Sequence, residues 1–587
     1  MAILNAEQIV QLYEQRKRAA GPVHEQMKKI RELANGDVIV PLNELDKSAQ
    51  ASVANLLVIG LDQMSMRVAS TMPTPYFPPI KEGSEGSKIN AKTRRQAMQA
   101  MWTHNRMPQK MRRRARHLLG YSSSPVYLKP DFATLIPRWT VINPLNTYAA
   151  PVDDPDDPLP QDCIFTYKAT AQYLMARYGE DIVGQLRMGQ VDADSKYQML
   201  EYVSPEAIQL VLLGAEDDPS LSMAQRSGMP QIMLEEIPNR TGRPLVVMPQ
   251  RITLDKPRGQ FDGILGMYYT RARLQALTEI AIERGIFPEE YLVARPGENP
   301  VIVQVADGKT GQLGIVKGGD IQQNQINPGY KTDTALDRLE RQERLEGAIP
   351  AEFGGESATN IRTGRRGENV LSSTVDFRIQ EAQSLFENSL LEEDKIAIAI
   401  EQAYWGKDKK SFYIPGKAGG YTSSYVPNKI WETDFHYVSY SAAGSDVNSL
   451  VVSLGQRLGA GLISKETARE TDPLISDPDM EHDRLVAEGV ESALLASIQS
   501  QAADPMGPYQ PDDLAYLTRL VLEKDLPLYE AVARTQQRAQ DRQAAMVEAN
   551  SPMAQPGLAM VGTGAESQVQ APQGGGGLDA LLSQLGG

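Results

Sequence analysis

Cysteine is almost missing from this sequence. Cys163 is the single cysteine among 587 residues, which excludes an internal disulfide and any metal site built from several thiolates. Its neighbours in the sequence include no basic residue that would activate a thiolate. We therefore expect a protein that folds in a reducing cytoplasm.

Long apolar runs are missing as well. The longest one, Ala51 to Leu61, is far shorter than the roughly 20 residues that a membrane-spanning helix needs. The first residues lead straight into a charged stretch and show no apolar core of a signal peptide. The sequence therefore predicts a soluble protein with no membrane partner.

Positive charge is in deficit over the whole chain. Lys and Arg number 60 against 74 Asp and Glu, so the formal net charge is −14, which argues against a protein that coats nucleic acid with a globally basic surface. Aromatic residues make up only 6% and hydrophobic residues 41%, an ordinary globular composition. The length predicts roughly three to five structural units.

Catalytic signatures are scarce too. Gly308-Lys309-Thr310 resembles the end of a phosphate-binding loop, but Val303 stands where that motif needs glycine. No GxSxG or HExxH pattern occurs, and no two histidines are four residues apart; the histidines are His24, His104, His117, His436 and His482. We predict no catalytic residue, no metal ligand and no cofactor. A hydrolase that uses dispersed carboxylates stays open as an alternative.

One acidic cluster, Asp153 to Asp157, gathers four carboxylates around Pro155. Such oxygens can hold a divalent cation, but the prolines disrupt the ligand spacing of a calcium-binding loop. A solvated turn is the favoured interpretation.

The pattern of secondary structure is α+β and mainly helical. Helical periodicity covers Ala6 to Ala19, Val23 to Leu33, Lys47 to Ser70 and Ile89 to His104, with Gly21-Pro22 as a break between the first two. From Tyr121 short β-rich runs follow, interrupted by one helix at Ala171 to Tyr178. These runs are Val126 to Leu128, Thr140 to Asn143, Cys163 to Lys168 and Pro244 to Met248.

Three helices with clear boundaries lie between Tyr268 and Trp405. The first two, Tyr269 to Arg284 and Thr332 to Glu346, enclose a strand-rich insert, and each is followed by glycine and proline. The third, Ser373 to Trp405, is about 50 Å long at 1.5 Å per residue. Ala351 to Leu371, before the third helix, has the glycine-rich composition of a mobile loop.

After Gly406 the sequence predicts a return of β structure and then helices. The strands are expected at Phe412 to Ile414 and Lys429 to Ser441, and the helices from Val447 to about Ala549. From Ser551 the composition of Gly, Pro, Gln, Ala and Ser predicts a disordered tail.

Local charge is the anomaly of this acidic chain. Between Gly86 and Pro130 there is no Asp or Glu but eleven Lys or Arg. This stretch is either a patch that binds DNA phosphates or an acidic partner, or a solvated helix face balanced by acids elsewhere in the fold. The candidate residues are Arg94, Arg95, Arg112, Arg113, Arg114 and Arg116. For Arg362, Arg365 and Arg366 in the predicted loop, contact with a polyanion is favoured.

The order of helix, small insert, helix, loop and very long helix resembles the portal protein of tailed double-stranded DNA bacteriophages, the siphophage-like portal family. Asn55 to Pro79 looks like the wing region of such proteins, and Gly461 to Ala468 is similar to the segment before their crown. The resemblance covers about residues 1 to 550. It implies wing, stem, clip, tunnel loop, spine and crown at the positions that follow. These are a wing at 1–260, stem helices at 261–285 and 332–347, a clip at 286–331, a tunnel loop at 348–371, a spine helix at 372–405, a returning wing segment at 406–445, a crown at 446–550 and a disordered tail at 551–587.

The resemblance also implies a function. Such a protein forms a homo-oligomeric ring of about twelve subunits at one capsid vertex. Double-stranded DNA passes through this channel during genome packaging and ejection, and Arg362, Arg365 and Arg366 would face it. The implied partners are terminase, the major capsid and scaffolding proteins and a head-completion adaptor. The implied location is the virion, with the host cytoplasm during assembly, and no reaction or cofactor is implied. Another virion structural protein, of the capsid or the tail, stays open as an alternative.

Overall fold

The structure is a computed structural model that describes most of the chain. The described residues are 3–37, 53–81, 84–154, 156–179, 194–213, 231–254, 256–286, 289–299, 301–302, 316–317, 319–324, 331–347, 349, 364–414, 421–440, 447–472, 475, 478–503, 509–522 and 528–549. The motif Gly308-Lys309-Thr310, Arg362 and the tail from Ser551 lie outside these residues.

The chain forms two compact units, Met1–Glu481 and His482–Gly587. Helices predominate and some sheet is present, so the α+β, mainly helical class is confirmed. The boundary between the units falls inside the segment expected as a single crown, 446–550.

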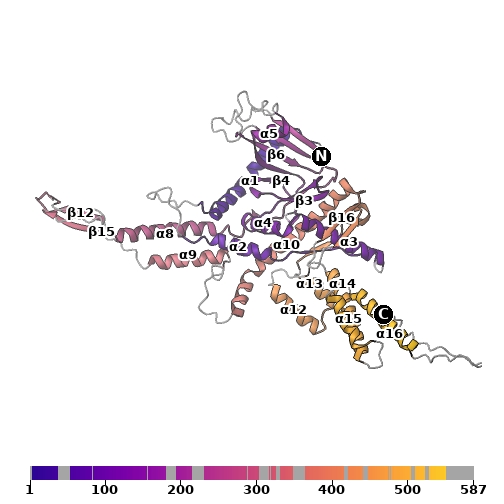
Figure 1. Cartoon of the computed structure of the whole chain (residues 1–587). Helices are drawn as coiled ribbons and strands as arrows, with labels where there is room; N and C mark the ends of the chain where they lie inside the picture. The colour runs from indigo at the N-terminus through magenta and orange to yellow at the C-terminus, as the bar shows by residue number, and fades with distance from the viewer. Residues whose placement is uncertain are drawn as a thin grey trace, which may run out of the picture. The chain divides into compact units, whose positions relative to one another are not determined.

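The helices of the first unit include four near the N-terminus, an antiparallel pair and one very long helix (Figure 1). They are α1 (Ala6–Asn35), α2 (Leu56–Val68), α3 (Glu85–His104), α4 (Met107–Tyr121), α5 (Ala171–Tyr178), α8 (Ile264–Ile286), α9 (Lys331–Gly347), α10 (Gly364–Trp405), α11 (Pro427–Ile430), α12 (Val447–Gly459), α13 (Lys465–Thr471) and the short η1 (Pro144–Asn146).

Helix α1 contradicts the expected break at Gly21-Pro22, because it continues without interruption through both residues. Pro22 has no N–H to donate to the carbonyl of Arg18, one turn earlier. Both residues are exposed on the solvent side of the helix. The buried side chains of Tyr13 and Met27, on either side of this point, hold the helix against the rest of the unit. Tertiary packing therefore outweighs the local cost of proline.

The strands form one larger sheet and several small ones. An antiparallel five-stranded sheet has the order β4-β5-β6-β7-β8, and a three-stranded sheet has the order β3-β2-β9. The strands before the stem-like helices are β1 (Thr74–Tyr76), β2 (Val126–Asp131), β3 (Ile136–Val141), β4 (Thr147–Ala149), β5 (Cys163–Thr170), β6 (Lys196–Val203), β7 (Ala207–Leu212), β8 (Ile232–Pro238), β9 (Val246–Val247), β10 (Ile252–Thr253) and β11 (Lys256–Pro257).

The later strands pair as short antiparallel ribbons, except that β18 pairs with β1 from far upstream. They are β12 (Glu289–Ala294), β13 (Val301–Ile302), β14 (Val316–Lys317), β15 (Gly319–Asn324), β16 (Lys410–Ile414), β17 (Tyr421–Tyr425) and β18 (Tyr437–Ser439). The expected strand Lys429 to Ser441 is wrong in its first part, where Pro427 opens the short helix α11.

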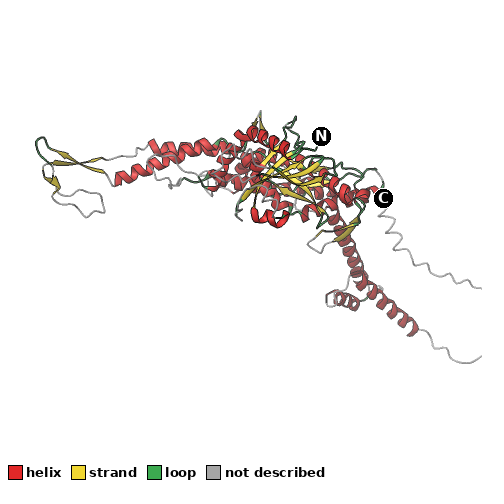
Figure 2. Ribbon diagram, turned by 90° about the horizontal axis from the view of Figure 1, so that it is seen from above, coloured by secondary structure: helices red, strands yellow, loops and turns green. Residues whose placement is uncertain are grey.

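Helices α8 and α9 lie side by side and run antiparallel, and the β12–β15 ribbon follows at the far end of the pair (Figure 1, Figure 2). The start of α8 lies near the end of α9, and Arg258, which precedes α8, lies 3.5 Å from Glu346 of α9. Gly60 of α2 touches the same end, since a Cβ there would lie 2.7 Å from Ile349. This close approach ties the helix pair to the N-terminal helices.

The main hydrophobic core joins α2, α4, β2, α8 and α10. Leu57, Leu118, Leu128, Ile264 and Phe386 are each almost completely buried in it. Full burial of such side chains stabilises by about 1.5 to 3 kcal/mol each. The 42-residue helix α10 therefore runs through the core for much of its length.

The second unit contains α15 (Pro511–Leu522), α16 (Leu528–Ala549) and most of α14 (Pro478–Ala503). Its own apolar cluster includes Ile498, Tyr509, Leu520 and Val532. A separate core explains why the expected crown divides, while α12 and α13 belong to the first unit.

Candidate nucleic-acid interface and the anchors of the long helix

Half of the predicted basic patch lies inside the protein. Arg94, Arg95 and Arg114 are 0%, 6% and 0% exposed. Arg94 donates to the carbonyl oxygen of Pro78 at 3.1 Å, and its burial lowers its pKa. The prediction that these three residues belong to a basic patch for DNA or an acidic partner is therefore wrong, because a buried guanidinium cannot contact a DNA backbone.

The other half of the patch is exposed on α4. Arg112, Arg113 and Arg116 face solvent, and Arg116 pairs with Asp62 at 2.7 Å. Within the described part of the chain, the side chains of Arg112 and Arg113 make no ion pair. The surface that remains for a polyanion on this helix is therefore small.

Arg114 is the first of three anchors that hold α10. Its guanidinium donates two hydrogen bonds to the carboxylate of Glu393, at 2.6 and 3.1 Å, and a third to the Ser389 hydroxyl at 2.8 Å. The guanidinium also lies 5.1 Å from the ring centre of Phe386. Burial raises the pKa of Glu393, and the Arg114 charge opposes that shift.

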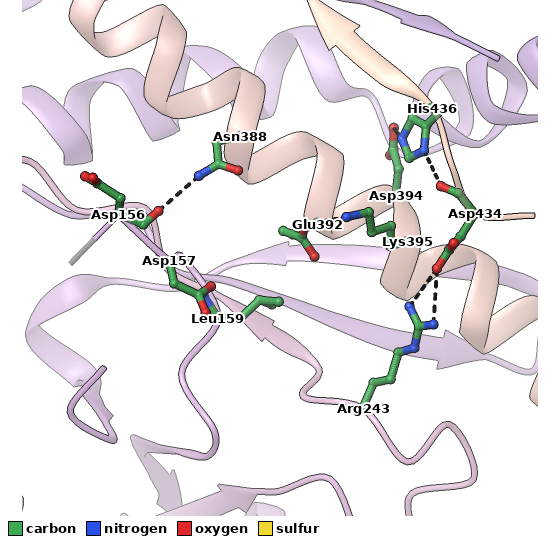
Figure 3. A network of polar contacts seen from close by, with 10 residues as sticks. All are labelled: Asp156, Asp157, Leu159, Arg243, Asn388, Glu392, Asp394, Lys395, Asp434 and His436. Atoms are coloured by element: carbon green, nitrogen blue, oxygen red, sulfur yellow. Dashed lines mark hydrogen bonds and ion pairs between the residues drawn. The ribbon is translucent and has the colours of Figure 1, made fainter. Parts of the chain in front are cut away.

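The second anchor is Asp394. It accepts a hydrogen bond from the Trp102 indole at 2.9 Å. It also lies 3.5 Å from Nε2 of His436 (Figure 3). The other ring nitrogen of His436 lies 2.8 Å from the carbonyl oxygen of Asp434. Burial lowers the pKa of His436, but the contact with Asp394 outweighs that effect and the pKa is raised.

The third anchor is Glu401, about two turns further along the same helix. Its carboxylate accepts hydrogen bonds from Lys410 at 2.7 Å, from Tyr425 at 2.9 and 3.1 Å and from Trp431 at 2.8 Å. Lys410 also lies over the Trp405 ring at 4.2 Å from its centre. The side chain of Glu401 is fully buried.

The three carboxylates share a role that the sequence prediction missed. Glu393, Asp394 and Glu401 are fully buried, and each accepts hydrogen bonds from donors outside α10. A buried carboxylate with several donors holds its helix in one position, since losing any donor leaves charge in a low-dielectric core. The sequence contains one indication that these carboxylates are buried, because they flank the apolar run Ile396 to Ile400.

The acidic cluster at Asp153 to Asp157 is a turn built from its own side chains. Asp154 accepts from the backbone N–H of Asp156 at 3.0 Å, and Asp157 accepts from that of Leu159 at 2.9 Å. Asn388 of α10 donates to the Asp156 carbonyl at 3.0 Å (Figure 3). Near the C-terminal part of α10, Arg243 pairs with Asp434 at 3.1 Å, as the same figure shows.

The α8–α9 pair is held by its own buried ion pair. Arg271 of α8 lies 2.8 Å from Glu343 of α9, and the side chains are 5% and 0% exposed. Arg271 also donates to the Ala54 carbonyl at 2.7 Å. Burial raises the pKa of Glu343 to about 7, although the Arg271 charge opposes the shift.

Only two of the three predicted tunnel-loop arginines lie within the described residues. Arg362 lies outside the described residues, whereas Arg365 and Arg366 belong to the first turn of α10, which begins at Gly364 rather than at 372. The loop boundary at 371 is therefore wrong by two turns. The reason is local, because the stretch from Arg365 to Leu371 has no proline to prevent the helix from starting earlier.

Two other candidate groups are enclosed by the fold. Cys163 is fully buried, which raises the pKa of its thiol. Burial, with Arg113 and Arg114 nearby, lowers the pKa of His117 to about 4. Among the described residues, no group of three or more His, Cys, Asp or Glu side chains is arranged to hold a metal ion. None of the described helices combines the length and apolar character needed to cross a bilayer.

Comparison with known proteins gives no family. No protein-family model matches this chain, and no curated protein matches it in sequence.

Proposed function

We propose that this chain is a subunit of a phage portal, a ring at one capsid vertex through which double-stranded DNA is packaged and ejected. One observation carries the proposal: the antiparallel pair α8 and α9 bears a strand ribbon at its far end and precedes the 42-residue helix α10. This order corresponds to stem, clip, stem and spine. Terminase and a head-completion adaptor would dock on the ribbon.

Exposed apolar residues support assembly into a ring. Leu277 and Ile282 on α8 are 45% and 46% exposed, and Leu345 on α9 is 69% exposed. Burying the exposed part of such a side chain against a neighbouring copy would stabilise the contact by about 0.7 to 2 kcal/mol. A row of identical contacts around a closed ring uses the same apolar surface in every copy.

The charge of the chain suits a conduit. A net charge of −14 in each copy would repel DNA from most of the ring surface. Transient contacts from Arg362, Arg365 and Arg366 would guide the DNA without gripping it, because an exposed ion pair is worth about 0 to 1 kcal/mol and is weakened by salt.

The test is imaging of the purified full-length protein by negative-stain electron microscopy, together with native mass spectrometry. We expect rings with a central channel and a mass of about twelve copies. A chain that stays monomeric at high concentration and across salt conditions would contradict the proposal. Closed shells or tubes would instead favour a capsid or tail component.

A further inference from the structure

A cavity of about 300 Å³ lies where the end of α3 and the start of α4 meet the β2–β3 hairpin. Most residues of its walls are polar and the positive charges outnumber the negative one, and the residues that matter are His104, Asn105, Arg106, Lys110, Asp131 and Arg138. Four of them, His104, Asn105, Arg106 and Lys110, come from the segment between Gly86 and Pro130 that has no Asp or Glu. The cavity is therefore the place where part of that unusual charge gathers.

The charges in the cavity do not balance. Arg106, Lys110 and Arg138 face a single carboxylate, Asp131, which already accepts the backbone N–H of Ala133 at 3.0 Å. Within the described part of the chain, the guanidinium groups of Arg106 and Arg138 make no hydrogen bond or ion pair. Both residues are exposed and line the cavity.

Lys110 is held in place at the wall of the cavity. Its ammonium group donates to the carbonyl oxygen of Trp139 at 2.5 Å and to the Asn105 side chain at 3.3 Å. Burial lowers the pKa of Lys110 to about 8, and the charge of Arg138 adds to the shift. A bound anion would offset this repulsion between cations.

The backbone also favours an anion at this place. Arg106 is the N-cap of the 15-residue helix α4 and has φ 53° and ψ 46°, a left-handed conformation that non-glycine residues seldom adopt. This position sets the guanidinium beside the positive end of the helix dipole.

We propose that this cavity binds a phosphate group with two negative charges, either free phosphate or the terminal phosphate of a small ester. Three cations against one carboxylate leave an excess that matches the charge of about −1.5 to −2 on a phosphate monoester at neutral pH. The two guanidinium groups offer the forked donors that phosphate oxygens prefer. A pocket bounded by a helix junction and a hairpin suits a small ligand better than a duplex.

The test is isothermal titration calorimetry of the full chain with inorganic phosphate at neutral pH and constant ionic strength. The double variant Arg106→Gln, Arg138→Gln removes both forked donors. The matched control Arg112→Gln, Arg113→Gln removes the same charge from exposed positions of α4, outside the cavity. Thermal unfolding of each variant shows that it folds as the wild type does.

We expect phosphate to bind the wild type and the control alike and to bind the cavity variant at least about tenfold more weakly. Adenosine monophosphate distinguishes the sources, because tighter binding than inorganic phosphate would identify an ester as the ligand. No binding of either compound to the wild type, or equal binding to the cavity variant, would overturn the proposal. Binding of only a DNA duplex or a glutamate-rich peptide, lost in the same variant, would also overturn it.

Discussion

Arg114 and its neighbours show how one turn of helix separates buried from exposed charge. Arg114 lies on the same side of α4 as Met111, Ala115 and Leu118, which are fully buried, whereas Arg112 and Arg113 lie on the opposite side. At 3.6 residues per turn, a shift of one or two positions turns a side chain from the core to solvent. The spacing of the apolar residues in α4 indicates which arginine is buried. The sequence prediction instead treated the run of arginines as one patch.

Replacement of Arg114 by Met should destabilise the first unit by about 3 to 5 kcal/mol, because it leaves the carboxylate of Glu393 buried without its partner. Urea unfolding followed by tryptophan fluorescence measures the change. The control Arg112→Met should alter the free energy of unfolding by no more than about 0.5 kcal/mol. Equal losses in both variants would show that Arg114 does not act through Glu393.

His436 should make stability depend on pH. Its pKa in the folded state is raised above the ordinary value of 6.5, so its contribution is fully present below pH 6.5 and is lost as the pH rises through the raised pKa. The variant His436→Gln should therefore be less stable than the wild type at pH 6, with a smaller difference at pH 9. Urea midpoints at the two pH values measure this.

The exposed His482 supplies the control for this measurement. His482→Gln should leave the midpoints unchanged at both pH values. A difference between His436→Gln and the wild type that stays constant with pH would mean that only packing is lost, and not the charged contact with Asp394.

At the scale of elements, the sequence predicted most helices and missed part of the sheet. The predicted bounds Ala171 to Tyr178 agree with α5, and the ends of the helix pair differ from the prediction by one to five residues. The long helix ends at Trp405 as predicted but begins nine residues earlier, at Gly364. The strands β6, β7 and β8 were not predicted. Most residues of β6 are buried on both faces, so its sequence lacks the alternation that identifies a half-exposed strand.

The candidate site was harder to predict than the fold. Which arginine meets which carboxylate depends on contacts between residues far apart in sequence, such as Arg114 with Glu393. Local periodicity gives the face of a helix but not the element that packs against it. The basic segment was therefore recognised as unusual while half of its arginines were assigned to the wrong environment.

Helix α1 offers a test of the cost of proline in a helix. Pro22 is exposed and has helical residues on both sides. Its missing N–H and the bulk of its ring therefore destabilise the helix, and its ring makes no buried contact that would compensate. Replacement by alanine should raise the free energy of unfolding by about 1 to 3 kcal/mol. Thermal and urea unfolding measure the gain. A loss of stability would show that a bend at Pro22 is needed for the packing of α1.

At the scale of the whole molecule, the exposed residues of the helix pair should decide assembly. The double variant Leu277→Ser, Ile282→Ser should keep the thermal unfolding of the single chain within a few degrees of wild type while ring formation falls, because the two side chains are about half exposed in one copy. Native mass spectrometry measures the mass distribution.

Leu254 provides the matched control, since it is 93% exposed and lies outside the helix pair. Leu254→Ser should assemble as the wild type does. If the Leu277 and Ile282 double variant assembles equally well, the copies meet through another surface and the stem assignment is wrong.

The anchors of α10 also determine when the chain can finish folding during synthesis. Trp102 and Asp394 are separated by 292 residues, and His436 and Trp431 come later still. At about 5 to 20 residues per second, a ribosome needs about 15 to 60 s to add that span. For this interval Trp102 of α3 and Arg114 of α4 exist without Asp394 and Glu393, the carboxylates that accept their hydrogen bonds. Any nascent chain arrested before residue 393 would therefore expose Arg114 and Trp102 to chaperones and proteases.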